Sequence, residues 1–275
     1  MHRLLVDEEA LKCDSPMLSK EAANHLKVVR PKDGEEIELF DGKGSWRVYK
    51  VGVGSGSGSG SGRAVFSLTS TSQPLNISTS KPLPLTLFAC VTKGSRWDWT
   101  IEKATELGVT RIVPVVSERT IVRIPKAERA AKRERWLRIA EEAARQSDAK
   151  WLPEILEPLD FDEALEFVKA TRCFIGALTS PPPRMILDEL ARGVARDTMD
   201  DRPGHAGYCT PSDSRGLAIF VGPEGDFTPT ELDSLIAIAT PVSFGPTVLR
   251  AETAAIFGLS VLAAYQQTER PRIEV

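Results

Sequence analysis

The feature that most constrains this chain is a pair of short apolar segments between residues 217 and 254, each ended by Gly-Pro. The first segment, 217–221, is apolar throughout, as a strand buried on both faces is. Residues 228–231, Thr-Pro-Thr-Glu, follow a glycine-rich loop and form a capping box with proline at the first helical position. The pattern predicts a strand, a glycine loop and a helix, and open α/β sheets bind ligands at such loops.

The second segment, 242–244, turns at Gly245 and leads into a helix after Leu249, with apolar residues at helical spacing. The two loops also contain Glu224 and an Arg250–Glu252 pair that we expect to be buried. Two interpretations are open at this point. The loops are either ordinary strand–helix connections of an α/β protein or two walls of a ligand site.

Both loops resemble the cofactor-loop motifs of one enzyme family. FVGPEGDFTPTEL, from residue 220, and SFGPTVLRAETA, from residue 243, are similar to motifs of the RsmE-type ribosomal RNA methyltransferases of the SPOUT superfamily. The resemblance implies an α/β fold, with a knotted SPOUT-type parallel-sheet domain preceded by a small PUA-like β-barrel domain. It also implies S-adenosylmethionine as methyl donor, methylation of N3 of a uridine in small-subunit (16S-type) ribosomal RNA, and a homodimer.

The resemblance assigns roles to individual residues. Arg250 is expected to hold the uracil, and Glu252 to orient Arg250 or to accept the N3 proton. The alternative is a structural ion pair between these two side chains. The cofactor pocket is expected to be lined by a strand end and by both loops, at Leu178, Val221, Gly222, Pro223, Glu224, Gly225, Phe244, Gly245, Leu249, Ala251 and Thr253.

The chain departs from the family at two positions. Asp226 stands where the family usually has glycine, and Asp148-Ala149 stands where it has Gly-Arg, so that Lys150 is the nearest cation. An acid at the pocket mouth is expected either to weaken binding or to face solvent. The departures favour an alternative function, a catalytically silent RNA-binding or ribosome-assembly factor, and methylation of another RNA is a third hypothesis.

The charge distribution is a weaker indication of RNA binding than the loop motifs are of a cofactor site. The net charge is −3, but residues 119–138 contain eight basic and two acidic residues, a local charge of +6. This run is either a solvated helix face or a phosphate-binding patch. The segment TKGSRWDWTIEKATELGVTRIVPVVSERT, from residue 92, also matches the family, and the acids Glu102 and Glu106 in it are expected to pair with Lys103 or Arg111. By resemblance, the expected RNA contacts are His25, Arg30, Lys93, Arg96, Arg119 and Arg123.

The chain order predicts two domains. We expect a PUA-like RNA-binding β domain at 1–75, a Ser/Thr/Pro-rich linker at 76–84, and a methyltransferase domain with a C-terminal trefoil knot at 85–275. A hairpin is expected to turn at 41–44, and the Gly-Ser tract at 52–62 is expected to form an enlarged hairpin loop after its second strand. Residues 197–216 are polar and are expected to be a disordered insertion.

Composition excludes several classes of protein. No apolar run approaches the roughly 18 residues that span a membrane. The four cysteines are scattered without a Cys-x-x-Cys pair, and the three histidines have no ligand spacing, so neither a disulfide framework nor a metal site is expected. We expect a reduced compartment, the cytoplasm, with an organellar ribosome as the alternative.

Overall fold

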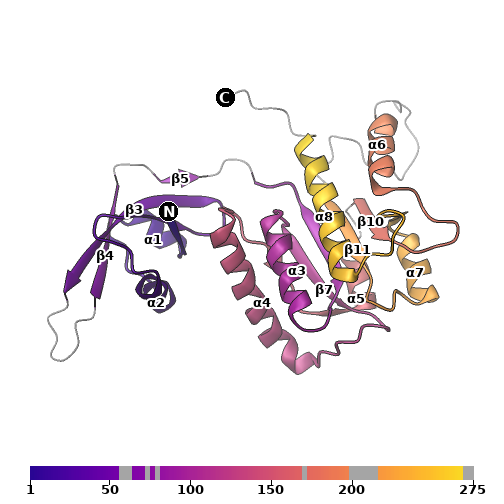
Figure 1. The fold of residues 1–275 in the computed structure, drawn as a ribbon, viewed down its shortest axis with the longest axis horizontal. Helices are drawn as coiled ribbons and strands as arrows, with labels where there is room; N and C mark the ends of the chain where they lie inside the picture. The colour runs from indigo at the N-terminus through magenta and orange to yellow at the C-terminus, as the bar shows by residue number, and fades with distance from the viewer. Residues whose placement is uncertain (56–63, 72–74, 78–80, 169–171, 198–215, 269–275) are drawn as a thin grey trace. The chain divides into compact units, whose positions relative to one another are not determined.

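The computed structural model describes residues 1–55, 64–71, 75–77, 81–168, 172–197 and 216–268, which form two units (Figure 1). Unit 1 is Met1–Lys81 with Ala144–Leu152, and unit 2 is Pro82–Ala143 with Pro153–Val275. The expected boundaries differ from this division in one large respect, because they leave 144–152 in the second domain. The predicted insertion at 197–216 and most of the Gly-Ser tract lie outside the described residues.

Unit 1 is a small β-sheet with two helices. The strand order is β1-β2-β3-β4, with β5 paired to β3. β1 pairs with β2 in parallel and the other neighbours are antiparallel, so the predicted hairpin between β2 and β3 is confirmed. The described strands thus form one small, mainly antiparallel sheet. The elements are β1 (His2–Leu5), α1 (Glu8–Lys12), α2 (Lys20–Val29), β2 (Glu36–Phe40), β3 (Ser45–Ser55), β4 (Ala64–Ser70) and β5 (Asn76–Ile77).

Two features of unit 1, the strand β5 and the end of the helix α2, were not predicted from the sequence. β5 lies inside the stretch predicted to be a linker, because Asn76 and Ile77 pair with Trp46 and Ser45 of β3. The segment before the hairpin is helical through Val29, and the helix ends at Arg30 in the left-handed conformation with φ of 52°. His25 therefore lies within this helix.

The segment 144–152 belongs to unit 1 because it bonds to the hairpin turn. Gly44 N donates to Lys150 O at 3.0 Å, and Leu152 N donates to Gly42 O at 2.8 Å. Gly44 has φ of 100°, and a Cβ there would lie 2.4 Å from the indole of Trp151, so this turn requires glycine. These contacts join residues about a hundred positions apart, which no local pattern predicts.

A buried cluster of charges fixes the same segment. Arg3 Nε donates to Glu38 Oε1 at 2.7 Å, and Lys150 Nζ donates to both oxygens of Glu38 at 2.6 and 2.8 Å. The Arg3 and Glu38 side chains are only 5% and 3% exposed. Lys150 also lies 4.5 Å from the centre of the Trp46 ring. Asp148, with φ of 60°, contacts Arg3 Nε at 3.1 Å, so the acid that replaces the family's glycine adopts the backbone conformation that glycine favours.

Unit 2 is a parallel α/β sheet with the order β12-β10-β11-β6-β7-β8, and β9 pairs with β7. Its strands are β6 (Leu85–Cys90), β7 (Arg111–Val116), β8 (Glu154–Ile155), β9 (Leu159–Asp160), β10 (Arg172–Gly176), β11 (Leu217–Val221) and β12 (Thr240–Val242). Its helices are α3 (Ser95–Glu106), α5 (Phe161–Glu166), α6 (Ile186–Asp197), α7 (Pro229–Ile236) and α8 (Ala251–Thr268), and α4 (Lys126–Gln146) continues into the part of the chain grouped with unit 1.

Both faces of this sheet are buried, which explains the unbroken apolar strands. Leu87 packs in one core with α3, α4, α6 and α8, whereas its neighbour Phe88 packs in a second core with α5 and α7 (Figure 1). All residues of β6 and β11 are buried. The predicted strand 217–221 is confirmed as β11. Strand order does not determine whether the chain is knotted, so the trefoil knot stays a prediction.

Within the described residues no helix is long and apolar enough to cross a membrane.

We predict that Glu38→Gln destabilises unit 1 by about 3 kcal/mol, because it removes the anion between two buried cations. Hydrogen exchange of the β1–β3 amides, followed by mass spectrometry, measures this loss within the intact chain. The control is Glu35→Gln. The Glu35 carboxylate is 34% exposed and lies 3.6 Å from His2 Nε2, so its loss should cost at most about 1 kcal/mol. Equal protection of the two variants would contradict the prediction.

Candidate functional site

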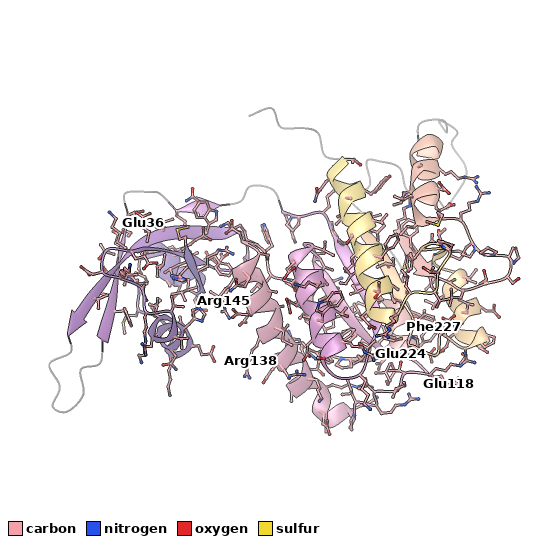
Figure 2. The ribbon with its side chains drawn as sticks, viewed as in Figure 1. Glu36, Glu118, Arg138, Arg145, Glu224 and Phe227 are labelled. Atoms are coloured by element: carbon pink, nitrogen blue, oxygen red, sulfur yellow. The ribbon has the colours of Figure 1, made fainter. Side chains whose placement is uncertain are left out.

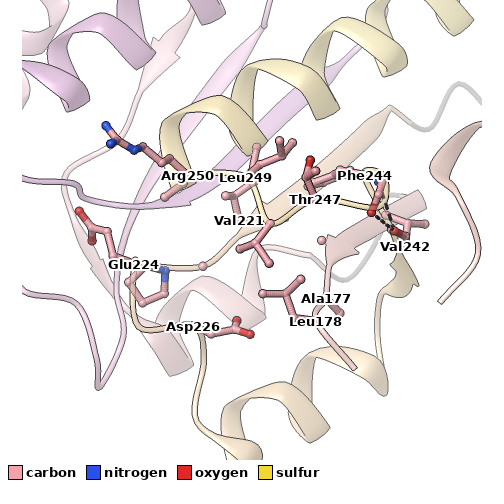
Figure 3. Close-up of a pocket in the computed structure, with 18 residues that line it drawn as sticks. Ala177, Leu178, Val221, Glu224, Asp226, Val242, Phe244, Thr247, Leu249 and Arg250 are labelled. Atoms are coloured by element: carbon pink, nitrogen blue, oxygen red, sulfur yellow. Dashed lines mark hydrogen bonds between the residues drawn. The ribbon is translucent and has the colours of Figure 1, made fainter. Parts of the chain in front are cut away.

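A pocket of about 300 Å³ lies where β10, β11 and β12 end (Figure 3). All three strands are parallel, so their carboxyl ends meet at one edge of the sheet. The volume is within the range of small-molecule sites, roughly 300–1,000 Å³. The lining consists of Gly176, Ala177, Leu178, Val221, Gly222, Pro223, Glu224, Asp226, Val242, Ser243, Phe244, Gly245, Thr247, Val248, Leu249, Arg250, Ala251 and Ala254.

The pocket contains nine of the eleven residues expected to bind the cofactor. The two that do not line it are Gly225 and Thr253. The lining residues that were not expected from the sequence include Gly176 and Ala177, and also Val242, Ser243, Thr247, Val248 and Ala254. Gly176 is constrained, because a Cβ there would lie 2.3 Å from the ring of Phe244. The signal for Gly176 and Ala177 was available, because they precede Leu178 at the same strand end.

The loop after β11 is held by two side chains. Arg119 Nη1 donates to Gly225 O at 3.0 Å and to Phe227 O at 3.3 Å. Glu231 Oε1 accepts from Glu118 N at 2.8 Å, and its other oxygen accepts from Thr228 N at 2.9 Å, which confirms the predicted capping box. Figure 2 shows Glu118, Glu224 and Phe227 at the same end of unit 2. The loop that forms one wall of the pocket is therefore tied to the loop after β7.

Asp226 is a constrained residue in this loop. Its φ is 58°, which explains why glycine suits the position. Aspartate tolerates this conformation, and here Asp226 Oδ1 accepts from Phe227 N at 2.8 Å. The residue is half-buried and lines the pocket, so it is not simply a solvent-facing acid. Within the described chain no cation pairs with its carboxylate.

Arg250 and Glu252 were both expected to be buried, but only the Glu252 side chain is mostly buried. Arg250 is exposed, at the residue before α8, and lies at the pocket's edge. The Glu252 side chain is 12% exposed, and its Oε1 lies 3.8 Å from Arg96 Nε, whereas the ion pairs among described residues include none with Arg250. Arg96 also lies 3.6 Å from Glu224 Oε1. Arg96 replaces Arg250 as the partner of Glu252 because the first turn of α3 lies beside the first turn of α8.

The basic run is mostly structural. Arg129 is buried and pairs with Asp160, Arg133 Nε donates to Ile155 O at 2.7 Å, and Arg135 pairs with Asp98. In the same run Arg119 and Arg123 bond to backbone carbonyls, those of Arg123 being Ser117 and Glu118. Of the eight basic residues in the described helix and loop, Lys126, Lys132 and Arg138 have no such partner. The solvated or structural interpretation therefore explains most of the charge.

The other expected RNA contacts are placed as follows. Lys93 is exposed in the loop after β6, and Arg96 lies in the first turn of α3 with a side chain 46% exposed. In unit 1, Arg30 is exposed and His25 is half-buried. Lys103 donates to Glu102 Oε1 and Glu106 Oε1, both at 2.8 Å, as the structural interpretation predicted. These bonds, first that to Glu102, raise the pKa of Lys103.

The thiols and acids show no metal chemistry in the part of the chain that is described. No group of three or more His, Cys, Asp or Glu side chains there can hold a metal ion. Burial raises the pKa of Cys90 to about 11 and that of Cys173 to about 12, so both remain protonated and unreactive near neutral pH.

Comparisons with known proteins identify the family. Residues 79–263 match a model described as an RNA methyltransferase domain, and residues 18–56 match one described as an RNA methyltransferase PUA domain. Ribosomal RNA small subunit methyltransferase E of Synechocystis sp. is 30% identical over 266 residues, which cover 96% of this chain and 77% of the relative. The enzyme of the same name from Bacillus subtilis is 28% identical over 195 residues, 70% of each chain.

Solved structures agree. Ribosomal RNA small subunit methyltransferase E from Neisseria gonorrhoeae, bound to S-adenosyl methionine, is 26% identical with a TM-score of 0.73, over 96% of this chain and 97% of that one. A methyltransferase from Legionella pneumophila with the bound cofactor SAM is 28% identical with a TM-score of 0.74, over 95% and 96%. These matches confirm the predicted fold class, a SPOUT-type parallel-sheet domain preceded by a PUA-like domain. With one family model over most of its length and a relative 30% identical, the chain belongs to the ribosomal RNA small subunit methyltransferase E family.

Proposed function

We propose that this chain transfers the methyl group of S-adenosylmethionine to N3 of a uridine in small-subunit ribosomal RNA. The observation that best supports the proposal is the pocket at the carboxyl ends of β10, β11 and β12, which collects nine of the eleven residues expected to bind that cofactor. Two solved relatives of the same fold contain this cofactor. The methylated position and the RNA come from the family resemblance.

The residues in the pocket suit this cofactor. Val221, Leu178, Phe244 and Leu249 offer apolar walls for an adenosine, and the glycine loops expose backbone groups for hydrogen bonds. Asp226 adds a carboxylate that no described cation neutralises, next to these apolar walls. A cationic ligand is favoured at such a position, and S-adenosylmethionine has a sulfonium and an ammonium group.

When bound, S-adenosylmethionine supplies an electrophilic methyl group. The chain's own residues must hold the uracil with N3 about 3–3.5 Å from that carbon. The bond from N3 to carbon forms as the bond from sulfur to carbon breaks, and the electron pair of the broken bond stays on sulfur. The N3 proton must leave, and we assign its acceptance to Glu252.

Arg250 has the second role in this proposal. Loss of the N3 proton puts negative charge on the uracil ring and its carbonyl oxygens. An exposed guanidinium at the edge of the pocket can donate to a carbonyl oxygen and stabilise that charge. A homodimer, expected from the resemblance, and a cytoplasmic site of action, expected from the composition, are part of the same proposal.

We predict that Asp226 binds the ammonium group of the cofactor's amino-acid part. A carboxylate beside the sulfonium would stabilise the ground state more than the transition state, because the sulfonium charge disappears during transfer, whereas the ammonium charge does not change. Asp226→Asn, which keeps an acceptor for Phe227 N, should weaken S-adenosylmethionine and S-adenosylhomocysteine equally, by about 10-fold. Calorimetry with both ligands, and with 5′-methylthioadenosine as the ligand without an ammonium group, measures this.

The three ligands separate the alternatives. Affinity for 5′-methylthioadenosine should not change in Asp226→Asn. A loss confined to S-adenosylmethionine would show that the carboxylate faces the sulfonium. An equal loss for all three would show that it faces the adenosine. Asp226→Gly, which restores the residue usual in the family, is the matched control for the backbone conformation and should give the same pattern.

We predict that Arg250→Ala lowers kcat for methylation of small ribosomal subunits by about 10²- to 10³-fold, because it removes a donor to the developing charge. Nucleoside mass spectrometry quantifies 3-methyluridine in ribosomal RNA from cells with and without the protein. The same method then follows methylation in vitro of the small subunits from cells that lack the protein. Arg184→Ala, an exposed arginine outside the pocket lining, is the control and should have wild-type activity.

The same measurement decides between the functions. Absence of 3-methyluridine with the wild-type protein, together with normal binding of S-adenosylmethionine, would favour methylation of another RNA. Absence of both would favour the catalytically silent RNA-binding factor. Full activity of Arg250→Ala would remove Arg250 from the mechanism and leave the rest of the proposal standing.

A further inference from the structure

A second hollow, of about 550 Å³, lies between the first turns of α3 and α8. Neither the motifs nor the cofactor pocket accounts for it. Its lining consists of Ser95, Arg96, Asp98, Trp99, Glu102, Glu252 and Thr253.

The hollow adjoins the cofactor pocket. Arg250 and Ala251 line the pocket, and the next two residues, Glu252 and Thr253, line the hollow. Arg96, from the hollow, lies 3.6 Å from Glu224 Oε1 of the pocket. The start of α8 contributes to both sites, so a ligand in the hollow would be next to a ligand in the pocket.

Trp99 gives the hollow a flat apolar surface. It is 41% exposed, whereas Trp97 and Trp136 are each 2% exposed and pack edge to face at 5.6 Å. An exposed indole beside charged groups suits stacking on a nucleobase, which is worth about 1–3 kcal/mol per base. The helix places Trp99 on the outer side of α3, away from the core that Trp97 enters.

Glu252 gives the hollow an unsatisfied acceptor. Its Oε2 is buried and has no hydrogen-bond partner among the described residues. A buried oxygen without a donor costs about 1–3 kcal/mol, so a ligand with an N–H group would gain by supplying one. Arg96 does not satisfy the carboxylate fully, because its nitrogen lies 3.8 Å from Oε1, beyond hydrogen-bond length.

The other acids of the hollow have cation partners. Asp98 pairs with Arg135 through Oδ2, although its buried Oδ1 has no hydrogen-bond partner among the described residues, and Glu102 accepts from Lys103. Arg96 lies between Glu224 and Glu252 at 3.6 and 3.8 Å, so its N–H groups remain free to bind a carbonyl or a phosphate oxygen. The hollow thus offers one aromatic face, two buried carboxylate oxygens without a partner, those of Glu252 and Asp98, and one cation with available donors. Of the two acids, Glu252 is the one that directly follows residues of the cofactor pocket in the chain.

We infer that this hollow binds a uracil base of the RNA substrate, which stacks on Trp99 and donates its ring N–H to Glu252 Oε2. Uracil matches the three features: its ring stacks, its N3–H is a donor, and its carbonyl oxygens are acceptors for Arg96. Glu252 is then both the recognition group for N3–H and the nearest base for its proton. The inference rests on the proposed function and adds the site of the acceptor base to it.

Kinetics of Trp99 variants test the stacking. Trp99→Ala should raise KM for small ribosomal subunits lacking the modification by about 10-fold, while the Kd for S-adenosylmethionine stays within twofold of wild type. Trp99→Phe keeps an aromatic face and should recover most of the loss. Leu187→Ala removes another exposed apolar side chain of unit 2, 58% exposed, and should have no effect. An unchanged KM for Trp99→Ala would overturn the inference.

The oligomeric state of the same variants tests a different occupant. Sedimentation should show that Trp99→Ala assembles as the wild type does. A shift of Trp99→Ala to a smaller species would show that a second copy of the chain covers this face, and would overturn the inference.

A crosslinking experiment separates this inference from the proposed function. Small-subunit RNA transcribed with 5-iodouridine is irradiated with the wild-type protein, and crosslinked peptides are identified by mass spectrometry. A crosslink at Trp99 supports the hollow as a uracil site even if no methylation is detected. Normal methylation without a crosslink at Trp99 would overturn the hollow and leave the proposed function intact.

Discussion

The hydrogen bonds of Arg119 to the carbonyls of Gly225 and Phe227 hold the loop on which the rest of the site depends. That loop has glycine at several positions and would otherwise sample many conformations. Glu231 adds a second tie through Glu118 N. Because one arginine and one glutamate brace the loop from the neighbouring strand's end, the backbone groups of the pocket are positioned before any ligand arrives, which lowers the entropy lost on binding.

Charge compensation separates structural from functional ionic groups in unit 2. Arg129, Arg135 and Lys103 each have a carboxylate partner. In the basic run, Arg119, Arg123 and Arg133 donate to backbone carbonyls, so five of its eight basic residues have structural partners. In the two hollows the carboxylate of Asp226 has no cation partner among the described residues, and Glu252 Oε2 and Asp98 Oδ1 are buried without a hydrogen-bond partner there. Uncompensated acids beside apolar surface are destabilising, so their presence is explained best by ligands.

The two departures from the family pattern have one physical explanation. Asp148 and Asp226 both have φ near 60°, the left-handed region where glycine is easiest and aspartate is tolerated. Asp226 bonds the following amide, and Asp148 joins the buried cluster of Arg3, Glu38 and Lys150. Lys150 bonds Glu38 and is not available as a substitute for the family's arginine. Both aspartates adopt a backbone conformation that suits glycine, so neither departure by itself supports loss of function.

The sequence by itself determined the features that depend on near neighbours. These are the apolar strands, the capping box of Thr228 and Glu231, and the glycine loops, because each follows from contacts within a few residues. The expected pocket residues came from the resemblance to the family, and nine of them are among the eighteen residues of the lining. The tertiary structure alone decided that 144–152 joins unit 1, that Glu252 pairs with Arg96 and not with Arg250, and that Arg119 braces a loop. The tertiary structure also decided that the Trp99 side chain is exposed. The reason is that these contacts join residues about a hundred or more positions apart, and a charged or aromatic side chain selects its partner only after strands and helices have met.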